Sequence, residues 1–237
     1  MDASDVSVVM PVRDGERYIV EALKSILTQT PSVLEIVVVD DGSTDGTRRV
    51  LESFGASIRV LSQPPTGQAA ATNLGITATS GELLAFLDAD DMWTAGSLGM
   101  RLARLAESDA PDGVFGRLEQ FVSPDIPLPN RERFRIDPDP PAVAMLSSLL
   151  LHRLAFDRVG PLDERLMTGA NLDWQSRARS ARVHLVPIPD VVSRRRIHDK
   201  NVGITQREGA RRDLITIVRA HRARQANQPT DRGPGSS

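Results

Sequence analysis

The chain has 237 residues, of which 40% are hydrophobic and 25% are charged, enough for one sizeable globular core. It contains no cysteine, which excludes disulfides, thiolate zinc sites and cysteine nucleophiles. Its first residues, Met-Asp-Ala-Ser-Asp, are neither basic nor apolar, and no window of 18 apolar residues follows. We therefore expect no transmembrane segment, no secretory signal and a cytoplasmic location.

Charge is unevenly spread along the chain, although the formal net charge is only −2. Residues 194–232 contain eleven Lys or Arg against four Asp or Glu, so this segment carries 11 − 4 = +7 and the rest carries −2 − 7 = −9. Such a segment is typical of a surface that meets phosphate, an acidic carrier or a membrane, or of a solvated helix face. We expect a basic amphipathic helix over residues 206–226 and a disordered tail over 227–237.

Strands and helices alternate over the first hundred residues. Apolar, β-branched runs predict buried strands, and apolar residues at helical spacing predict the helices between them. The expected strands are 6–12, 34–39, 58–61 and 82–87, and the expected helices are 16–28, 45–54, a helix after Gly67 that ends at Ala78, and 95–106. Ser43 or Thr44 is expected to cap the second helix. This order predicts a parallel, doubly wound sheet.

The second half of the chain is less regular. The expected strands are 114–122, 147–151, 183–186 and 191–197, and the expected helices are a short one ending at 159, then 172–181 and 210–226. Six of the nineteen residues 123–141 are proline, which predicts a long surface loop. Loops of that length are often lids or binding segments, so we expect this one to contact a ligand.

Carboxylates follow the strand expected at 82–87. Asp88, Asp90 and Asp91 come directly after its apolar run. In an open α/β sheet, ligands bind outside the carboxyl ends of the strands, so these side chains are expected to meet a ligand. Hard carboxylate oxygens at alternate positions suit a divalent cation that also holds phosphate. For Asp91 the alternative is a place in the first turn of the following helix, where the helix dipole favours a negative charge.

Five segments in order carry a resemblance to a known family. They are VSVVMPVRDGERYI, IVVVDDGSTDGT, a segment with Gly67 and Asn73-Leu74-Gly75, GELLAFLDADDMW, and a later region with FDRVGPLDERLMTG and RRRIH. Together they resemble family-2 glycosyltransferases of the GT-A fold, over roughly residues 6–205. The resemblance implies one α/β domain, Rossmann-like and doubly wound, with a mostly parallel sheet flanked by helices. It also implies transfer of a sugar from a nucleoside diphosphate donor, with inversion and with Mn²⁺ or Mg²⁺.

The same resemblance implies a division of the domain, which we expect to span residues 1–226. Residues 1–110 would bind the nucleotide sugar and residues 111–205 would face the acceptor. The expected nucleotide-binding residues are Pro11, Val12, Arg13, Glu16, Asp41, Gly67, Thr72, Asn73, Asp88, Ala89 and Arg196. Thr72 departs from the family, which often has arginine there, so donor affinity or base preference is expected to differ.

Asp41 is the residue that the resemblance places at the base. Its carboxylate, which can only accept, would bind the imide N–H of a uracil or thymine. The alternative for Asp40 and Asp41 is turn chemistry, because Asp-Gly followed by a capping Ser is a good turn by itself.

The resemblance also supplies a metal site. Asp88 and Asp90 match the family's DxD pair, and His198 matches a histidine that contacts the metal or the diphosphate, although a lone histidine is more often structural. The expected ligands of Mn²⁺ or Mg²⁺ are Asp90, Asp88 and His198. One or two of the arginines 194–196 are expected to face the diphosphate, where cations neutralise charge on the leaving group.

The acceptor side departs from the family at the expected general base. Family members usually have an acidic pair after the glycine that matches Gly169, and this chain has Ala170 and Asn171 there. An amide has no usable basicity, so Asn171 cannot be the base, and Asp173 is the nearest carboxylate. Because i and i+2 point away from each other on a helix, Asp173 is not an automatic substitute. Both residues remain our catalytic candidates.

Four explanations for the missing base stay open. Asp173, Asp163 or Glu164 serves instead, or the acceptor is a thiol, which needs little help. Alternatively the protein binds the donor without transferring it, or Asn171 is an engineered replacement.

We predict a metal-dependent, inverting transferase that uses a UDP- or dTDP-type sugar. The alternative is a degenerate member that binds nucleotide sugar with little transfer. A nucleotidyltransferase and a dinucleotide-binding oxidoreductase are poorer matches, because no basic Gly-rich phosphate loop and no Gly-x-Gly-x-x-Gly follow the first strand. The expected partners are the donor and an unknown acceptor (a peptide, glycan, lipid carrier or small molecule), with no nucleic acid, and a homodimer formed through the C-terminal part.

Overall fold

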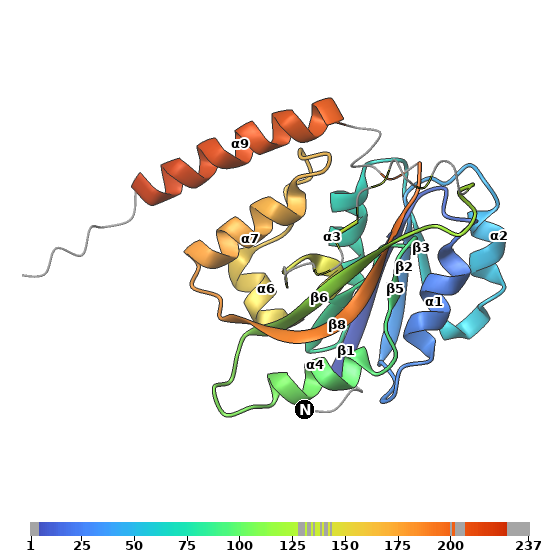
Figure 1. The fold of residues 1–237 in the computed structure, drawn as a ribbon, viewed down its shortest axis with the longest axis horizontal. Coiled ribbons are helices and arrows are strands. Elements are labelled where there is room, and N and C mark those ends of the chain that lie inside the picture. Colours follow the sequence, from blue (N-terminus) through green and yellow to red (C-terminus); the bar gives the residue numbers. More distant parts are fainter. Residues whose placement is uncertain are drawn as a thin grey trace, which may run out of the picture.

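The computed structural model of the chain describes residues 5–127, 144–199, 201 and 207–226, with residues 131, 134, 136, 137, 139 and 142 between them. The expected disordered tail, much of the proline-rich loop and the segment before the last helix lie outside the described residues. The described residues form one domain around an eight-stranded sheet in the order β3-β2-β1-β4-β7-β6-β8-β5 (Figure 1).

The first half of the sheet is parallel. Its strands are β1 (Val6–Val12), β2 (Glu35–Asp40), β3 (Arg59–Ser62) and β4 (Leu83–Phe86). β1 pairs in parallel with β2 on one side and β4 on the other, and β2 pairs in parallel with β3. A parallel strand that is covered on both faces needs apolar residues throughout, which explains the nearly continuous apolar runs of β1, β2 and β4.

The second half of the sheet is mixed. Its strands are β5 (Met92–Trp93), β6 (Gly113–Val122), β7 (Leu149–His152) and β8 (Leu185–Ile197). β7 is antiparallel to both β4 and β6, β6 is parallel to β8, and β5 is antiparallel to β8. Six of the eight strands therefore run in one direction. The expected α/β fold with a mostly parallel sheet is confirmed, but two segments predicted as separate strands form the single long strand β8.

Helices cover both faces of this sheet (Figure 1). They are α1 (Ile19–Leu27), α2 (Thr47–Glu52), α3 (Gln68–Ala78), α4 (Ser97–Leu105), α6 (Arg153–Val159), α7 (Ala170–Ser180) and α9 (Arg207–Ala226), with 3-10 turns at Gly55–Ser57 and Leu146–Ser148. On one face the core joins side chains of α1 and α4, such as Leu23 and Leu98, to the sheet. On the other face Phe156 of α6 and Trp174 of α7 pack beside Phe86 of β4. This burial of apolar surface on both faces is the main stabilising contribution to the fold.

The predicted cap of α2 was wrong. Neither Ser43 nor Thr44 caps α2, because the hydroxyl of Ser43 accepts from the Asp14 N–H and Thr44 donates to the Asp14 carboxylate. Asp45 instead accepts the N–H of Thr47, the first residue of α2.

Among the helices that the structure describes, none is long and apolar enough to cross a membrane.

Candidate active site

The carboxyl ends of β1, β2 and β4 meet at one edge of the sheet. The Asp41 N–H donates to the Val12 carbonyl at 2.8 Å, and the Leu87 N–H donates to the Val9 carbonyl at 3.2 Å. These bonds continue the parallel ladders to the points where the chain leaves the sheet. The residues that follow, Asp41 after β2 and Asp88 after β4, therefore belong to the same rim, where open α/β sheets bind ligands.

Asp41 holds the loop that opens α3. One carboxylate oxygen accepts from the Gln63 amide at 2.7 Å and the Thr66 N–H at 2.8 Å, and the other accepts from the Gly67 N–H at 2.9 Å. The residue is only 4% exposed. A carboxylate has about four acceptor positions, so these three bonds leave one for a ligand N–H. Asp40 forms the predicted turn, because its carboxylate accepts the Ser43 N–H at 2.9 Å.

The first residues of α3 connect Asp41 with Asp88. Gly67 contacts Asp41, and the amide of the next residue, Gln68, donates to the Asp88 carboxylate at 2.7 Å. Gly67 has a φ of +111°, a conformation that favours glycine. The glycine allows the chain to turn at the rim, so that the amino end of α3 lies between the two carboxylates.

Asp90 lies against the end of β8. Its carboxylate is 2.9 Å from Nε2 of His198 and 3.2 Å from the side-chain amide of Asn201. Asn201 also accepts the His198 N–H at 2.6 Å, which fixes the turn after β8. The structure thus brings together Asp90 and His198, which are 108 residues apart in the chain.

Asp91 is buried behind this pair. It is 2% exposed and accepts the Arg196 N–H at 2.9 Å. The next residues form β5, and α4 begins only at Ser97, so the alternative of a first-turn helix position for Asp91 is wrong. Its carboxylate instead joins the turn after β4 to the end of β8.

The turn after β4 holds more negative charge than its surroundings offset. Burial, followed by the negative charge of Asp90, raises the pKa of Asp88 to about 6. Burial and the charges of Asp90 and Asp88 raise the pKa of Asp91 well above its usual value, while Arg195 acts in the opposite direction on both carboxyls. The site therefore favours a bound cation, which would stabilise the ionised carboxylates.

The donor set fits a divalent metal in part. Carboxylates at alternate positions and a neighbouring imidazole are ligand types that Mn²⁺ accepts, and oxygens alone suit Mg²⁺. Within the described residues, no three His, Asp or Glu side chains are already arranged to hold a metal ion. Asp88, Asp90 and His198 would need additional oxygens, such as those of a diphosphate, to complete the coordination.

Arg196 does not face this rim. It is 2% exposed, and its guanidinium binds Glu21 at 2.5 Å and the Asp90 carbonyl at 3.0 Å. It also lies 4.6 Å from the centre of the Tyr18 ring. Because the guanidinium is buried and already bound to Glu21 and to the turn after β4, it is poorly placed for the expected contact with a nucleotide. Arg195, which is half-buried and whose charge acts on Asp88, is better placed.

Two further expected nucleotide contacts have other partners. Thr72 is 3% exposed and donates to the Gln68 carbonyl within α3 at 2.8 Å. The Asn73 side chain exchanges hydrogen bonds with the backbone of Leu162 at 3.0 and 2.9 Å and donates to Glu164 at 2.9 Å. In this structure Asn73 therefore fastens α3 to the segment before α7, and Thr72 belongs to the interior.

The remaining expected residues lie near the end of β1. Val12 is buried, Pro11 and Ala89 are partly buried, and Arg13 is exposed. Glu16 accepts the Gly46 N–H at 3.0 Å and pairs with Arg49 at 2.9 Å, so it holds the start of α2.

The catalytic candidates lie in the first turn of α7. The Asn171 amide is 2.9 Å from the Met145 sulfur, and its carbonyl oxygen is buried without a partner. Asp173 is 6% exposed and pairs with Nε of Arg177 at 2.7 Å. Asp173 also lies 3.6 Å from Arg224 of α9 and lines a cavity of about 360 Å³ between the segment 161–166, α7 and α9. Such a buried ion pair disfavours the role of general base.

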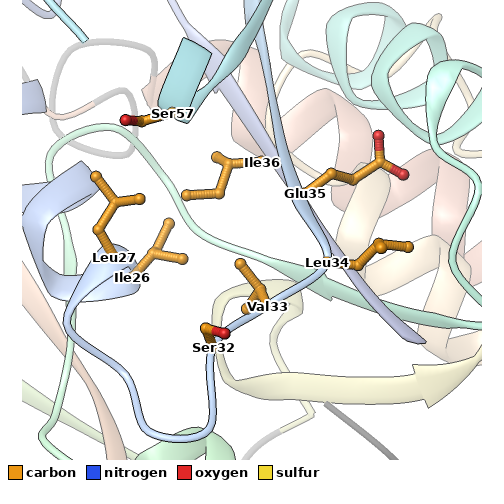
Figure 2. Close-up of a pocket in the computed structure, with 8 residues that line it drawn as sticks. All are labelled: Ile26, Leu27, Ser32, Val33, Leu34, Glu35, Ile36 and Ser57. Carbon is orange, nitrogen blue, oxygen red and sulfur yellow. The ribbon is translucent and has the colours of Figure 1, made fainter. Parts of the chain in front are cut away.

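A second, smaller hollow lies at the opposite end of the sheet. It measures about 80 Å³ and is lined by the end of α1, with Ile26 and Leu27, by Leu34, and by the start of β2, with Glu35 and Ile36 (Figure 2). Because it lies at the amino ends of the strands, it is separate from the carboxylate rim.

Sequence reasoning missed two contacts of the carboxylate rim. Gln68 binds Asp88, and Asn201 binds Asp90. Gln68 follows the glycine that opens α3, so its place at a helix start was a usable signal. Asn201 had no comparable signal, because its contact depends on how the end of β8 meets the turn after β4.

The comparisons with known proteins identify the family. A model of "Glycosyl transferase family 2" matches residues 7–155. The chain belongs to this family. An uncharacterized glycosyltransferase of Nostoc sp. is 39% identical over 118 residues, which are 48% of this chain and 36% of that protein. The chain is also similar to an Escherichia coli enzyme, the UDP-Glc:alpha-D-GlcNAc-diphosphoundecaprenol beta-1,3-glucosyltransferase WfgD, at 37% identity over 46% of this chain and 44% of the enzyme.

A solved structure shows the same fold. Staphylococcus aureus TarS 1-349, in complex with UDP-GlcNAc, has a TM-score of 0.73 and 19% identity, covering 96% of this chain and 68% of that one. The family-2 chain described here spans less than half the length of the two curated relatives.

Proposed function

We propose that this family-2 domain is a metal-dependent, inverting glycosyltransferase that binds a UDP- or dTDP-type sugar at the carboxylate rim. One observation carries the proposal: Asp90, two residues after Asp88, has its carboxylate 2.9 Å from the His198 imidazole at the carboxyl end of the sheet. This contact supports the metal site of Asp88, Asp90 and His198 that the family resemblance implies. The UDP-glucose donor in the name of WfgD and the UDP-GlcNAc bound to TarS support a nucleotide-sugar donor.

Each residue at the rim has a proposed role. Asp41 accepts the imide N–H of the base through its remaining acceptor position. Asp88, Asp90 and His198 would hold Mn²⁺ or Mg²⁺, which when bound offsets negative charge on the diphosphate. Arg195 approaches the diphosphate from β8 and stabilises it by charge. Gln68 orients the Asp88 carboxylate.

The acceptor side favours a second candidate function, donor binding with little transfer. Asn171 supplies no base, and Asp173 is buried in an ion pair with Arg177. Asp163 is also a poor base, because hydrogen bonds from Arg165 lower the pKa of its carboxyl. A transferase that keeps this acceptor side would use the exposed Glu164 as its base, an acceptor that loses its proton easily, or a base that the acceptor brings.

Calorimetric titration with UDP tests the donor site, with and without Mn²⁺. We expect UDP to bind in the presence of Mn²⁺ and to bind much more weakly in its absence. Titration with dTDP and with GDP as the control measures base preference, because guanine presents a different hydrogen-bonding edge to Asp41. Absence of binding by every nucleoside diphosphate would contradict both candidate functions.

A further inference from the structure

The outward face of α9 combines exposed aliphatic side chains with arginines. Leu214, Ile215 and Val218 are 51%, 53% and 42% exposed, although each is an apolar residue in a helix. Spacings of three and four residues place them on one side of α9. The opposite side holds Ile217, which is 5% exposed, so α9 is apolar on both its buried and its outward face.

The inward face explains how α9 is attached. The Asp213 carboxylate accepts the N–H groups of Thr168 and Gly169 at 2.8 and 3.0 Å, just before α7. Further along, Arg224 donates to the hydroxyl of Ser176 at 3.0 Å. α9 therefore lies along α7, at the outside of the domain (Figure 1). This attachment leaves the outward aliphatic residues without a described partner inside the domain.

Positive charge surrounds the outward aliphatic residues. Arg211 lies four residues before Ile215, and Arg222 lies four residues after Val218, so both extend the same stripe. Arg212 and Arg219 are also exposed, at its flank. Asp213 is the only acidic residue between positions 211 and 222, and it is buried against α7. The described outward side chains thus present aliphatic groups and four arginines with no carboxylate.

We infer that this outward face of α9 docks the domain onto an anionic lipid bilayer. A helix with apolar and arginine side chains on its outer face lies in the membrane interface, with the apolar groups below the headgroups and the cations among them. Arginine stems also extend so that their charges reach the headgroups. Two copies of this chain packed through the same face would bring arginines of like charge together, which disfavours self-association there.

Docking in this way would place the start of α7 close to the membrane, because Asp213 joins the two helices. The inference does not depend on sugar transfer, since it rests on the surface of α9 alone. UDP binding can be measured on the same protein preparation in the absence of lipid. Failure of the membrane inference is therefore distinguishable from failure of the proposed donor site.

Vesicle co-sedimentation tests the inference with the full chain. We expect binding to vesicles in which phosphatidylglycerol replaces part of the phosphatidylcholine, weak binding to phosphatidylcholine alone, and loss of binding at high salt. Arg211→Gln combined with Arg222→Gln should weaken binding by roughly 25-fold, because each arginine near an anionic surface contributes about fivefold. Leu214→Gln combined with Val218→Gln should weaken it by at least about tenfold, because less apolar surface is buried.

Matched controls separate α9 from general charge and hydrophobicity. Arg48→Gln combined with Arg49→Gln removes two exposed arginines on α2, and Leu154→Gln removes a residue that is 81% exposed on α6. Neither control should change vesicle binding. No binding to anionic vesicles by the unchanged protein, or equal binding by the α9 variants, would overturn the inference. So would self-association in lipid-free solution, measured by analytical ultracentrifugation, that the Leu214 and Val218 substitutions abolish.

Discussion

At the scale of single residues, Asp90 is the group whose removal should matter most for donor binding. Its carboxylate contacts both His198 and Asn201 and is 31% exposed, so it is available to a ligand. Replacing even a group behind a metal ligand typically costs 10–100-fold in affinity, so we expect Asp90→Ala to weaken Mn²⁺-dependent UDP binding by at least about 100-fold. Calorimetry measures this loss directly.

The control for Asp90 is another surface carboxylate. Asp109 pairs with Arg104 after α4, away from the rim, and Asp109→Ala should leave UDP affinity unchanged. If Asp90→Ala bound UDP as tightly as the unchanged protein with Mn²⁺ present, the metal assignment would be wrong.

Arg101 is a buried charged residue in α4 that we expect to lower the stability of the fold. Its side chain is fully buried, one guanidinium nitrogen has no partner, and the rest contacts Ser97 and the ring of Trp93 at 4.3 Å. Burial lowers the pKa of Arg101 to about 9. The cation–π contact with Trp93 offsets only about 2 kcal/mol of the cost of removing the guanidinium from water. Because methionine avoids that cost and fills a similar volume, Arg101→Met should stabilise the protein by about 1–3 kcal/mol. Urea unfolding at neutral pH checks this, and a less stable variant would contradict it.

The stabilisation by Arg101→Met should depend on pH in a defined direction. The pKa of about 9 in the folded state lies below the ordinary value of 12.5, so between these values the unfolded chain binds more protons and stability rises with pH. The cost of burying Arg101 is thus complete below pH 9 and declines above it. The difference in unfolding free energy between the variant and the unchanged protein should be smaller at about pH 10.5 than at about pH 7.

Residue roles were predictable where the signal was local. Asp88 and Asp90 follow a strand at alternate positions, which indicates the rim from sequence alone. Thr72 and Arg196 were misplaced for a physical reason: the period of a helix or strand tells which residues share a face, but not which neighbours already occupy their hydrogen bonds. Arg196 is engaged by Glu21 and by the Asp90 carbonyl, contacts that arise only when the end of β8 meets the turn after β4.

At the scale of elements, the packing of α3 on the sheet depends on Gly75. A Cβ atom there would lie 2.4 Å from Val9 Cγ1 and 3.2 Å from Val39 Cγ2. Overpacking of this kind costs 1–3 kcal/mol, so we expect Gly75→Ala to destabilise the fold by about 1–2 kcal/mol despite the better helix propensity of alanine. The measurement is the unfolding free energy in urea.

Gly99 in α4 is the matched control. The nearest atom to a Cβ there is the Thr30 carbonyl oxygen at 3.4 Å, an ordinary contact. Gly99→Ala should therefore stabilise the protein by about 0.5–1 kcal/mol through helix propensity. Equal effects of the two substitutions would show that α3 does not approach β1 and β2 as closely as described.

Asp213 links α9 to the segment that leads into α7. Its carboxylate accepts from the Thr168 and Gly169 N–H groups, which lie just before α7. Removal of an acceptor that leaves buried donors unpaired costs about 1–3 kcal/mol, and we expect about 1–2 kcal/mol for Asp213→Ala, with faster proteolysis within residues 207–226. Asp213→Asn keeps an acceptor oxygen and should lower the unfolding free energy by about half as much. Equal losses for the two variants would show that the charge of Asp213, not its acceptor oxygen, stabilises the contact.

Most elements were predictable because their apolar periods are strong. Every helix and strand expected in the first hundred residues exists, with ends shifted by a few residues, as the start of α1 at Ile19 illustrates. The short strand β5 was missed, since two residues carry no period. The prediction divided β8 into two strands because Pro187, Pro189 and Asp190 are typical of a break. The strand nevertheless continues through these residues beside β6.

At the scale of the whole molecule, the parallel half of the sheet follows from the order of its elements, because right-handed connections leave few arrangements. The position of β7, antiparallel between β4 and β6, did not follow from the sequence. That insertion closes the second half of the sheet and allows β8 to place His198 beside Asp90. Periodicity specifies elements, but the pairing of distant strands depends on packing between whole surfaces.

Whether the whole domain transfers sugar depends on the start of α7, and restoring the acidic pair tests this. The Asn171 oxygen has no partner, and an aspartate at this helix start would be stabilised by the helix dipole. A general base contributes about 10²–10⁴-fold to rate, so Ala170→Glu combined with Asn171→Asp should raise UDP release from UDP-sugars, with water as acceptor, by at least about 100-fold. Ala170→Glu alone is the control and should not. No gain from the pair, with UDP binding intact, would indicate a different base; a gain would show that the donor side is competent and that these two positions limit transfer.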